Sequence, residues 1–321
     1  MTRRRAVPWA LLAAAAAGAL FFARMRVRVD PDLFFHLADG RGVFAGRLPL
    51  AEAYSYTRAG RPMVATEWLS SASFYAAFRA GGYPAVALLA SLLLAGALGL
   101  AAAAIGAETS EETRALLVAL AAFALLPFAL AKVQNYTFLL FALDLYWIRL
   151  WERGRRWVPW AMAGLLALWV NLHGGFMLGW VLLGGVCALE LGRTRRAAAL
   201  LPWAAGTFAC FLHPNGALAF VYPIWFVFAP PAGRSLIVEW RPAALALPLL
   251  PDALILALAL ALRADRLRSR FPWALPALVF LVMGLRARKM LPFFALSAAV
   301  AAGRAAAGVA RSRPRGRLAL A

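Results

Sequence analysis

The sequence predicts an all-α protein, a polytopic bundle of about ten membrane-spanning helices. Of its 321 residues, 64% are hydrophobic and only 15% are charged, and the mean hydropathy is +0.73. A water-soluble domain could not bury so much apolar surface in one core. Apolar runs near the length of a membrane span recur along the whole chain, and short arginine clusters separate many of them. These features together predict a membrane protein.

A helix needs about 20 apolar residues to cross a bilayer, with a range of about 17 to 25. The expected spans are residues 7–23, 83–105, 115–131, 136–151, 157–172, 174–191, 197–212, 245–262, 271–285 and 290–307. Several are short, so flanking tryptophan and arginine side chains would complete the crossing. The first run follows Arg3, Arg4 and Arg5 as in a signal peptide, but no small-x-small cleavage site follows it, and we expect a retained helix.

Arginine and lysine resist translocation across a bilayer and therefore set the orientation. With the N-terminus in the cytoplasm, four further clusters also fall on the cytoplasmic side. They are Arg153, Arg155 and Arg156; Arg193, Arg195 and Arg196; Arg263, Arg266, Arg268 and Arg270; and Arg311, Arg313, Arg315 and Arg317. We expect a bacterial inner-membrane protein with both termini cytoplasmic, residues 1–310 forming a single transmembrane domain and residues 311–321 a basic tail.

The formal net charge of +20 does not predict a nucleic-acid partner, because the basic residues lie in short clusters between apolar runs. Membrane lipids with anionic headgroups are the expected partners. The long outer loop, residues 24–82, is predicted to carry two helices in the membrane interface. The first covers 33–44, and the second runs from Thr66 to Arg79 and ends at Gly81 and Gly82. Residues 216–228 are predicted to be interfacial or re-entrant.

The unusual polar residues fall almost entirely on the outer side, although the arginines alone set this topology. They are Asp30, Asp32, His36, Glu67, Gln134, Asn135, Asn171, His173, His213, Asn215, Glu239, Arg241, Arg286, Arg288 and Lys289. Asp144 differs, because it lies inside the fourth expected span. An ionisable group at that depth should face the bundle interior with a partner, either Arg149 or an arginine of another helix.

Asp30 and Asp32 flank a proline directly after the first span. Such a pair can act as a general base with a helper, or can seat a divalent metal such as Mg²⁺ or Mn²⁺. Either aspartate can equally cap the helix that follows. His36 lies one helical turn after Asp32 and can meet it or bond a headgroup. Glu67 can bind substrate or serve only the first turn of its helix.

The dense cluster Arg286, Arg288 and Lys289 falls on the outer side, against the positive-inside tendency. We interpret it as a phosphate or pyrophosphate site, because arginine binds phosphate through two parallel hydrogen bonds and lysine adds a point charge. Lipid headgroup binding is the alternative.

Three outer turns carry further candidate substrate ligands. Asn171 with His173 and His213 with Asn215 can bond substrate hydroxyls or cap exposed backbone, and Glu239 with Arg241 can bind a sugar beside Trp240 or lock its own loop by a salt bridge.

Several short motifs resemble those of a group of bacterial polytopic proteins. They are Asp30-Pro-Asp-x-x-x-His36, Thr66-Glu-Trp-Leu69, Trp169-Val-Asn-Leu-His-Gly-Gly-Phe176, His213-Pro-Asn-Gly216, Glu239-Trp-Arg-Pro242 and Arg288-Lys-x-x-Pro-Phe-Phe294. That group is similar to the C-type (GT-C) glycosyltransferase superfamily, which includes protein O-mannosyltransferases and lipid A sugar transferases. The resemblance covers residues 30 to about 295 and rests on analogy of fold for the activity.

The resemblance implies a donor in which a polyprenyl phosphate carries the sugar. It further implies that Asp30 is the general base or helps to seat a metal, with Asp32 as helper, and that Arg286, Arg288 and Lys289 hold the donor phosphate. The expected function is transfer of a sugar to an acceptor outside the cytoplasm. A transporter or flippase for a lipid-linked substrate and a non-catalytic assembly subunit are the alternatives. A transporter predicts polar residues through the whole bundle, whereas this sequence has few.

Overall fold

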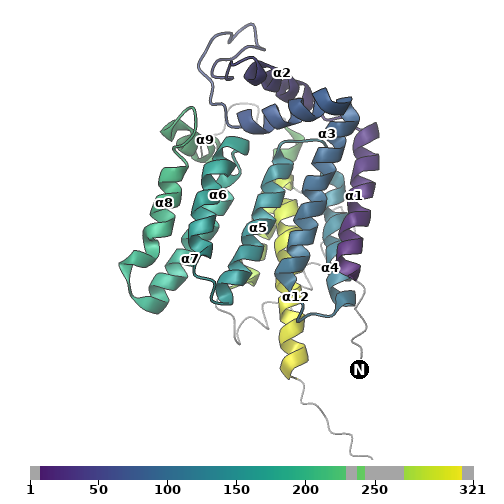
Figure 1. The fold of residues 1–321 in the computed structure, drawn as a ribbon, viewed down its shortest axis with the longest axis vertical. Helices are drawn as coiled ribbons and strands as arrows, with labels where there is room; N and C mark the ends of the chain where they lie inside the picture. The colour runs from purple at the N-terminus through teal and green to yellow at the C-terminus, as the bar shows by residue number, and fades with distance from the viewer. Residues whose placement is uncertain (1–7, 229–236, 243–270, 313–321) are drawn as a thin grey trace, which may run out of the picture.

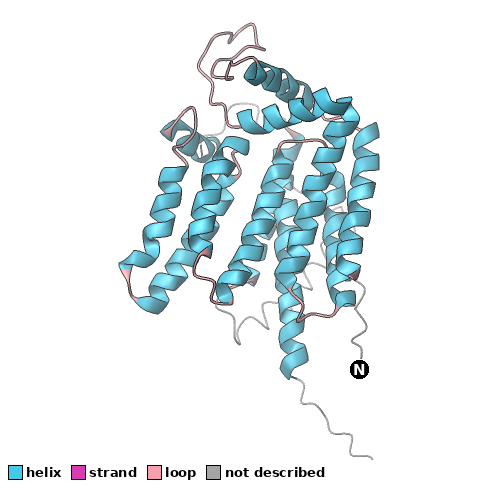
Figure 2. Cartoon of the chain, in the orientation of Figure 1, coloured by secondary structure: helices cyan, strands magenta, loops and turns pink. Residues whose placement is uncertain are grey.

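The computed structural model describes residues 8–228, 237–242 and 271–312, which are helical throughout, with connecting loops and no β-strand (Figures 1 and 2). The all-α prediction is confirmed. The α-helices are α1 (Trp9–Val27), α2 (Asp32–Phe44), α3 (Trp68–Ile105), α4 (Glu111–Leu125), α5 (Gln134–Glu152), α6 (Val158–Leu172), α7 (Phe176–Thr194), α8 (Leu201–Ala209), α9 (Ala217–Phe228), α11 (Ala274–Arg286) and α12 (Leu291–Ser312). The short 3-10 turns are η1 (Leu126–Phe128), η2 (Ala197–Leu200), η4 (Val238–Trp240) and η5 (Arg288–Met290).

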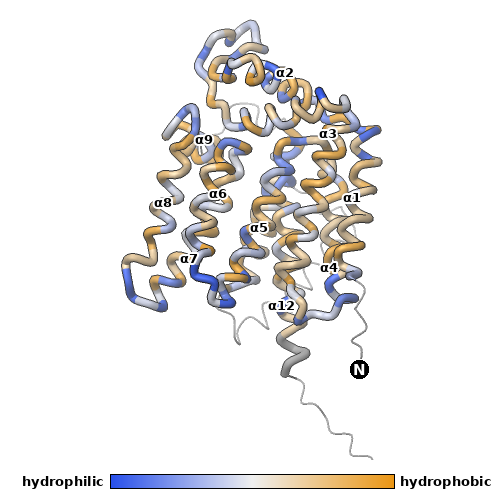
Figure 3. Tube along the Cα trace, in the orientation of Figure 1, coloured by the Kyte–Doolittle hydropathy of each residue, from blue (hydrophilic) through white to orange (hydrophobic). Residues whose placement is uncertain are grey.

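Among the described residues, four helical segments are long and apolar enough to cross a membrane, by length and composition: α1, α3, α7 and residues 288–307. Large apolar side chains on the bundle exterior also indicate a membrane protein, since Leu92, Phe123 and Val181 are at least 60% exposed. In Figure 3 the hydrophilic colours gather at the two ends of the bundle. The count of about ten spans stays a prediction, and the expected span 245–262 lies outside the described residues.

The predicted pair of helices in the first long loop is present, and it forms a layer across one end of the bundle. There α2 lies against the first part of α3, residues 68–80 (Figure 1). Gly40 permits this close packing, because a Cβ at that position would lie 2.2 Å from the backbone oxygen of Ser71. The chain breaks at Gly82, whose φ of 64° is readily adopted by glycine, and then continues as the long apolar part of α3.

We call the end that carries this layer the α2 end, and the opposite end the N-terminal end. The start of α1 and the arginine-rich α5–α6 and α7–η2 connections lie at the N-terminal end (Figure 1). Phe138, Phe141, Phe280 and Phe293 pack together in the core between α5, α11 and α12. The core therefore fixes the α2 end of three helices that contribute to the site described below.

Ion pairs between helices tie the N-terminal end together. Glu108 accepts hydrogen bonds from Arg149 and Arg153, and Glu152 accepts from Trp273 and pairs with Arg304 at 2.8 Å. The predicted pairing of Asp144 with Arg149 is therefore wrong, because Glu108 in the α3–α4 connection binds the guanidinium instead. Asp144 is buried, and its Oδ1 has no hydrogen-bond partner among the residues that the structure describes.

Candidate functional site

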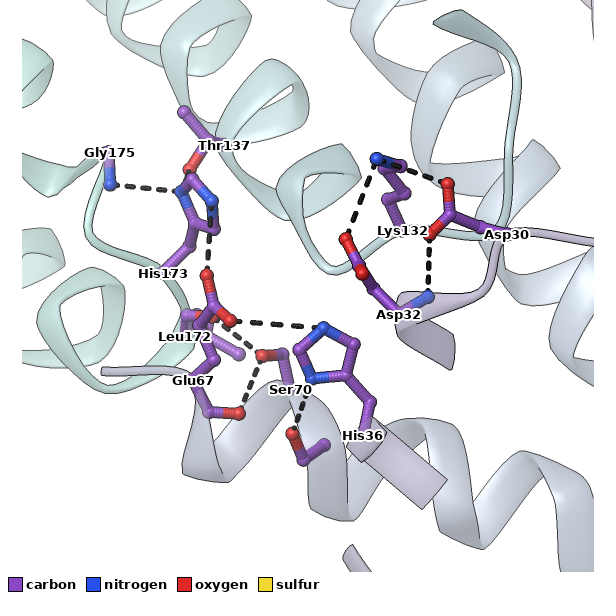
Figure 4. A network of polar contacts seen from close by, with 11 residues as sticks. Asp30, Asp32, His36, Glu67, Ser70, Lys132, Thr137, Leu172, His173 and Gly175 are labelled. Atoms are coloured by element: carbon purple, nitrogen blue, oxygen red, sulfur yellow. Dashed lines mark hydrogen bonds and ion pairs between the residues drawn. The ribbon is translucent and has the colours of Figure 1, made fainter. Parts of the chain in front are cut away.

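Two neighbouring groups of ionisable side chains lie at the α2–α3 layer, and Figure 4 labels all of them except Glu239. We call Asp30, Asp32, Lys132 and Glu239 the lysine cluster, and His36, Glu67 and His173 the glutamate cluster. The seven residues come from five separate parts of the chain. The fold therefore brings Asp30, His36, Glu67, His173 and Glu239 close together. The sequence predicted only that they lie on the same side of the membrane.

Lys132 is the centre of the lysine cluster. Its Nζ lies 3.0 Å from Asp30 Oδ2 and 3.8 Å from Asp32 Oδ2, and it also donates a hydrogen bond to Glu239. Asp30 is 4% exposed, and its Oδ1 accepts the backbone N–H of Asp32 at 2.9 Å. Burial acts to lower the pKa of Lys132, but the hydrogen bonds and charges of Glu239 and Asp30 outweigh it and raise that pKa. The lysine is therefore firmly cationic and holds the acidic groups in place.

A second lysine joins the cluster through Trp240. Lys289 Nζ lies 3.4 Å from the centre of the Trp240 ring, in a cation–π contact. The backbone N–H of Arg288 donates to the carbonyl of Arg241 at 3.0 Å, so that η4 and η5 are joined side by side. This contact places Arg288 and Lys289 beside Glu239 and the lysine cluster. The sequence could not show that the Glu239 and Arg288 motifs meet.

In the glutamate cluster, Glu67 lies between two histidines. Its Oε1 is 3.4 Å from His173 Nε2, and its Oε2 is 3.8 Å from His36 Nε2. Glu67 is the residue before the first turn of α3, and no capping hydrogen bond from its side chain is present. Burial raises the pKa of Glu67 to about 7, against the opposing effect of Lys289. This carboxyl group can therefore exchange a proton near neutral pH.

Hydrogen bonds on its far side fix the orientation of His173. Its Nδ1 lies 2.9 Å from both the backbone N–H of Gly175, which donates, and Thr137 Oγ1. Trp169 Nε1 in turn donates to Thr137 Oγ1 at 3.0 Å. Because Nδ1 accepts, the proton of the neutral imidazole sits on Nε2 and points at Glu67. Burial and the charge of Lys289 lower the pKa of His173 to about 3, which keeps the ring neutral.

His36 is held in a similar way, by Ser71 Oγ at 3.0 Å from its Nδ1. Burial lowers the pKa of His36 to about 4, so this ring is also neutral near pH 7. Ser70 Oγ lies 2.6 Å from the carbonyl of Leu172, which ties the start of α3 to the end of α6 (Figure 4). The two histidines are therefore fixed on either side of Glu67.

A cavity of about 540 Å³ lies next to the glutamate cluster. Its walls come from α2, the 49–67 loop, the start of α3 and Tyr222 of α9. Glu67, His36 and Asp39 supply polar groups, and several aromatic side chains supply flat apolar faces. These aromatic residues are Phe35, Tyr54, Trp68 and Tyr222. The α2 end therefore combines a reactive carboxyl group with space for a small molecule.

Other predicted site residues bind the protein's own backbone. Asn171 accepts from Trp68 Nε1 at 2.7 Å and donates to the carbonyls of Ala167 and Leu212. His213 Nε2 lies 3.1 Å from the Ala65 carbonyl, and Asn215 Oδ1 accepts the Ala65 N–H at 2.9 Å. These three side chains shape the cavity by fixing the loop before α3, as the backbone-capping alternative predicted.

The basic cluster 286–289 lies at the end of α11 and in η5. Arg286 is exposed and Arg288 is half-buried, and neither makes an ion pair among the described residues. Glu239 pairs with Lys132 instead of forming the salt bridge within its own loop that the sequence left open.

The Asp30–Asp32 pair does not fit the metal seat that the sequence allowed. The Lys132 ammonium group lies between the two carboxylates, where a divalent cation would need to bind. Within the described ranges, no three histidine, cysteine, aspartate or glutamate side chains are grouped as metal ligands. The charge that balances these aspartates is supplied by the chain itself.

Sequence reasoning missed Lys132 and Thr137. A compositional signal pointed to Lys132, because only Lys132 and Lys289 are lysines among the 34 basic residues, and both lie at this site. Thr137 gave no such signal, since a hydroxyl group inside an apolar helix commonly bonds its own backbone.

Comparisons with protein-family models, with curated proteins and with solved structures found no match to this chain.

Proposed function

We propose that the chain is a membrane glycosyltransferase that moves a sugar from a polyprenyl-phosphate carrier to an acceptor outside the cytoplasm. One observation carries the proposal: the lysine cluster, the 286–289 cations and the glutamate cluster meet at one end of a membrane helix bundle, beside a cavity. Transfer from a lipid phosphate uses cations to stabilise the leaving phosphate and a carboxylate to activate the acceptor hydroxyl.

In this proposal the donor phosphate binds Arg286, Arg288 and Lys289. Arginine side chains without a carboxylate partner can donate two parallel hydrogen bonds to a phosphate. Lys132 is less suitable as a phosphate ligand, because Asp30, Asp32 and Glu239 surround it with more negative charge than it carries. Its role is to hold Glu239, and with it Trp240, beside Lys289.

Asp30 then acts as a positioning residue. Both of its oxygens are engaged, one by Lys132 and the other by the N–H of Asp32. A carboxylate bound in this way is a poor acceptor for a substrate proton. The resemblance implied that Asp30 is the general base, whereas the geometry favours a carboxylate that lines the cavity.

The transporter alternative would need polar groups along a path through the bundle. Among the described residues, the buried polar side chains near the middle of the helices are few, chiefly Ser91, Asp144 and Ser297. Ser91 and Ser297 each donate to a carbonyl of their own helix. This distribution supports a reaction at one end of the bundle over passage through it.

The test is binding of undecaprenyl phosphate to the purified protein in detergent. The variant Arg286→Ala/Arg288→Ala/Lys289→Ala is expected to lose most of the binding, since each lost phosphate contact by a charged group weakens affinity by about tenfold or more. The matched control is Arg155→Ala/Arg156→Ala/Arg196→Ala, which removes three exposed cations at the N-terminal end. This control is expected to bind like wild type.

Equal loss of binding in both triple variants would reduce the effect to net charge and contradict a phosphate site at 286–289. If wild type does not bind undecaprenyl phosphate, the glycosyltransferase proposal fails. The non-catalytic assembly subunit then becomes the leading interpretation.

A further inference from the structure

The cavity beside Glu67 has an unusual charge for this protein. Among the described residues, its wall includes three carboxylates, from Asp39, Glu52 and Glu67, and no arginine or lysine, although the chain has 34 basic and 14 acidic residues. Such a cavity repels phosphate, because each carboxylate disfavours a nearby anion. The donor phosphate therefore does not belong in this space.

The cavity walls fit a polyhydroxylated ligand. Phe35 and Tyr54 stack edge to face with ring centres 5.0 Å apart, and Tyr54 donates its hydroxyl to Asp39. Glu52 Oε1 accepts the backbone N–H groups of Tyr54 and Ser55, which fixes the loop that carries them. Flat aromatic faces beside carboxylate acceptors are suited to a sugar ring, which presents C–H groups on its faces and hydroxyl donors at its edge.

Glu67 belongs both to the cavity wall and to the glutamate cluster. Its side chain is 33% exposed, and that exposed part lines the cavity. The neutral His173 ring directs its Nε2–H at Oε1, and His36 lies near Oε2. The carboxylate therefore lies between two fixed rings and also lines the space where a ligand would bind.

We propose that this cavity is the acceptor site, that its ligand is a neutral or amino-bearing saccharide without phosphate, and that Glu67 takes up the proton of the acceptor hydroxyl. The inference rests on the proposed glycosyltransferase function. His36 and His173 act as positioning residues for Glu67, and the anionic donor head group stays on the Arg288 and Lys289 side.

The reaction balances with these groups alone. The acceptor O–H bond breaks, its proton passes to the Glu67 carboxylate, and the acceptor oxygen forms a bond to the anomeric carbon. The bond between that carbon and the phosphate oxygen breaks, and its electron pair leaves with the phosphate, next to Arg288 and Lys289. Displacement in one step inverts the anomeric centre. Glu67 later returns its proton to water as the product leaves.

The groups that face Glu67 set the pH at which it accepts a proton. Three of them, Asp32, His36 and Asp39, are on α2. The others are Lys132 before α5, His173 after α6, Tyr222 on α9 and Lys289 in η5. A pKa of about 7 for Glu67 makes it basic enough to accept a proton and still largely ionised just above neutral pH.

The experiment is labelling of the full-length protein in detergent with a hydrophobic carbodiimide, which reacts with protonated carboxyl groups, followed by peptide mass spectrometry at Glu67. Labelling is expected to be half-maximal near pH 7 and to fall about tenfold per pH unit above it. The His173→Gln variant is expected to shift this midpoint, whereas the exposed Glu112 in the same sample serves as an internal control. A midpoint at about pH 5 or below, as in an unperturbed glutamate, would overturn the assignment of Glu67.

Protection from labelling tests the ligand class. A pool of neutral methyl hexosides, and separately glucosamine, are each expected to slow the labelling of Glu67. Hexose 1-phosphates are expected to leave the labelling rate unchanged. Labelling that neither neutral hexosides nor glucosamine slow, or that the phosphorylated sugars slow best, would overturn the acceptor site. Undecaprenyl phosphate binding is measured on the same preparations, with Glu112→Gln, a change at an exposed residue outside both clusters, expected to match wild type. Failure of wild type to bind undecaprenyl phosphate would instead reject the proposed function, whatever the labelling shows.

Discussion

Both ends of the helix bundle carry buried or partly buried carboxylates, but the two ends balance them with different partners. At the N-terminal end, Glu108 pairs with Arg149 and Arg153, and Glu152 pairs with Arg304 and the Trp273 indole. At the α2 end, the cations are lysines and the remaining partners are neutral histidines. Arginine forks lock carboxylates into fixed geometry, whereas histidines leave a carboxyl group able to change its protonation.

The comparison separates a structural use of buried charge from a chemical one. The ion pairs at the N-terminal end join α5 to the α3–α4 connection and to α12, and they are expected to contribute stability. The cavity of about 540 Å³ lies at the α2 end, next to the carboxylate whose pKa is raised to about 7. Perturbed carboxyl groups beside cavities are typical of functional sites.

The largest expected effect is that of Lys132→Met. This change leaves Asp30 buried without its cation and frees Glu239, and the cost should be about 3 to 5 kcal/mol of unfolding free energy. Thermal unfolding in detergent measures it. The double variant Lys132→Met/Asp30→Asn should recover part of the loss, because the buried charge is then removed as well. A single-variant loss below about 1 kcal/mol would show that Asp30 finds water and that the lysine cluster is open.

Arg149→Met tests the opposite end. Glu108 keeps Arg153 after this change, so a smaller loss of about 2 to 3 kcal/mol is expected. Undecaprenyl phosphate binding should be retained once the protein is folded, since Arg149 lies at the far end of α5 from the proposed site. Loss of binding in folded Arg149→Met protein would contradict the division of roles between the two ends.

Thr137→Val removes the hydroxyl that joins Trp169 to His173. The indole N–H is left without its partner inside the bundle, at a cost of about 1 to 2 kcal/mol. The pH midpoint of Glu67 labelling should also change, because His173 loses part of its anchoring. Thr137→Ser restores the hydroxyl and serves as the control. If Thr137→Val shifts stability but never the midpoint, Thr137 supports only packing.

Glu67→Gln is expected to stabilise the protein at high pH, whereas the preceding variants are expected to destabilise it. The pKa of Glu67 is raised on folding from 4.5 to about 7, so the folded protein binds more protons than the unfolded chain between these values. Wild-type stability should therefore fall as the pH rises from about 4.5 to about 7 through this group. Glu67→Gln should match wild type near pH 4.5 and exceed it above pH 7, by about 1 kcal/mol after solvent screening. Equal stabilities of the two proteins at pH 8 would contradict the raised pKa.

Asp32→Asn is expected to have the smallest effect. Asp32 is 65% exposed and lies 3.8 Å from Lys132, and exposed ion pairs contribute about 0 to 1 kcal/mol. Unfolding midpoints of the variant and wild type should nearly coincide. A loss comparable to that of Lys132→Met would mean that Asp32 is an essential partner of the lysine cluster.

The sequence by itself determined the helical fold and most helix positions. Apolar periodicity and length set each helix locally, and Gly81 with Gly82 marked the break between the α2–α3 layer and the long part of α3. The sequence also predicted that Asp30, His36, Glu67 and His173 lie at one end of the bundle. The arginine clusters assign alternate connections to the cytoplasmic side, which leaves these four residues on the opposite side.

Only the tertiary structure decided which of these groups act on one another. Lys132 pairs with Glu239 across 107 residues of sequence, and His173 approaches Glu67 from the α6–α7 connection. Neither pairing has a local pattern, since each depends on how helices distant in sequence pack. The resemblance implied that Asp30 is the base, but Asp30 is buried beside Lys132, whereas the Glu67 side chain lines the cavity.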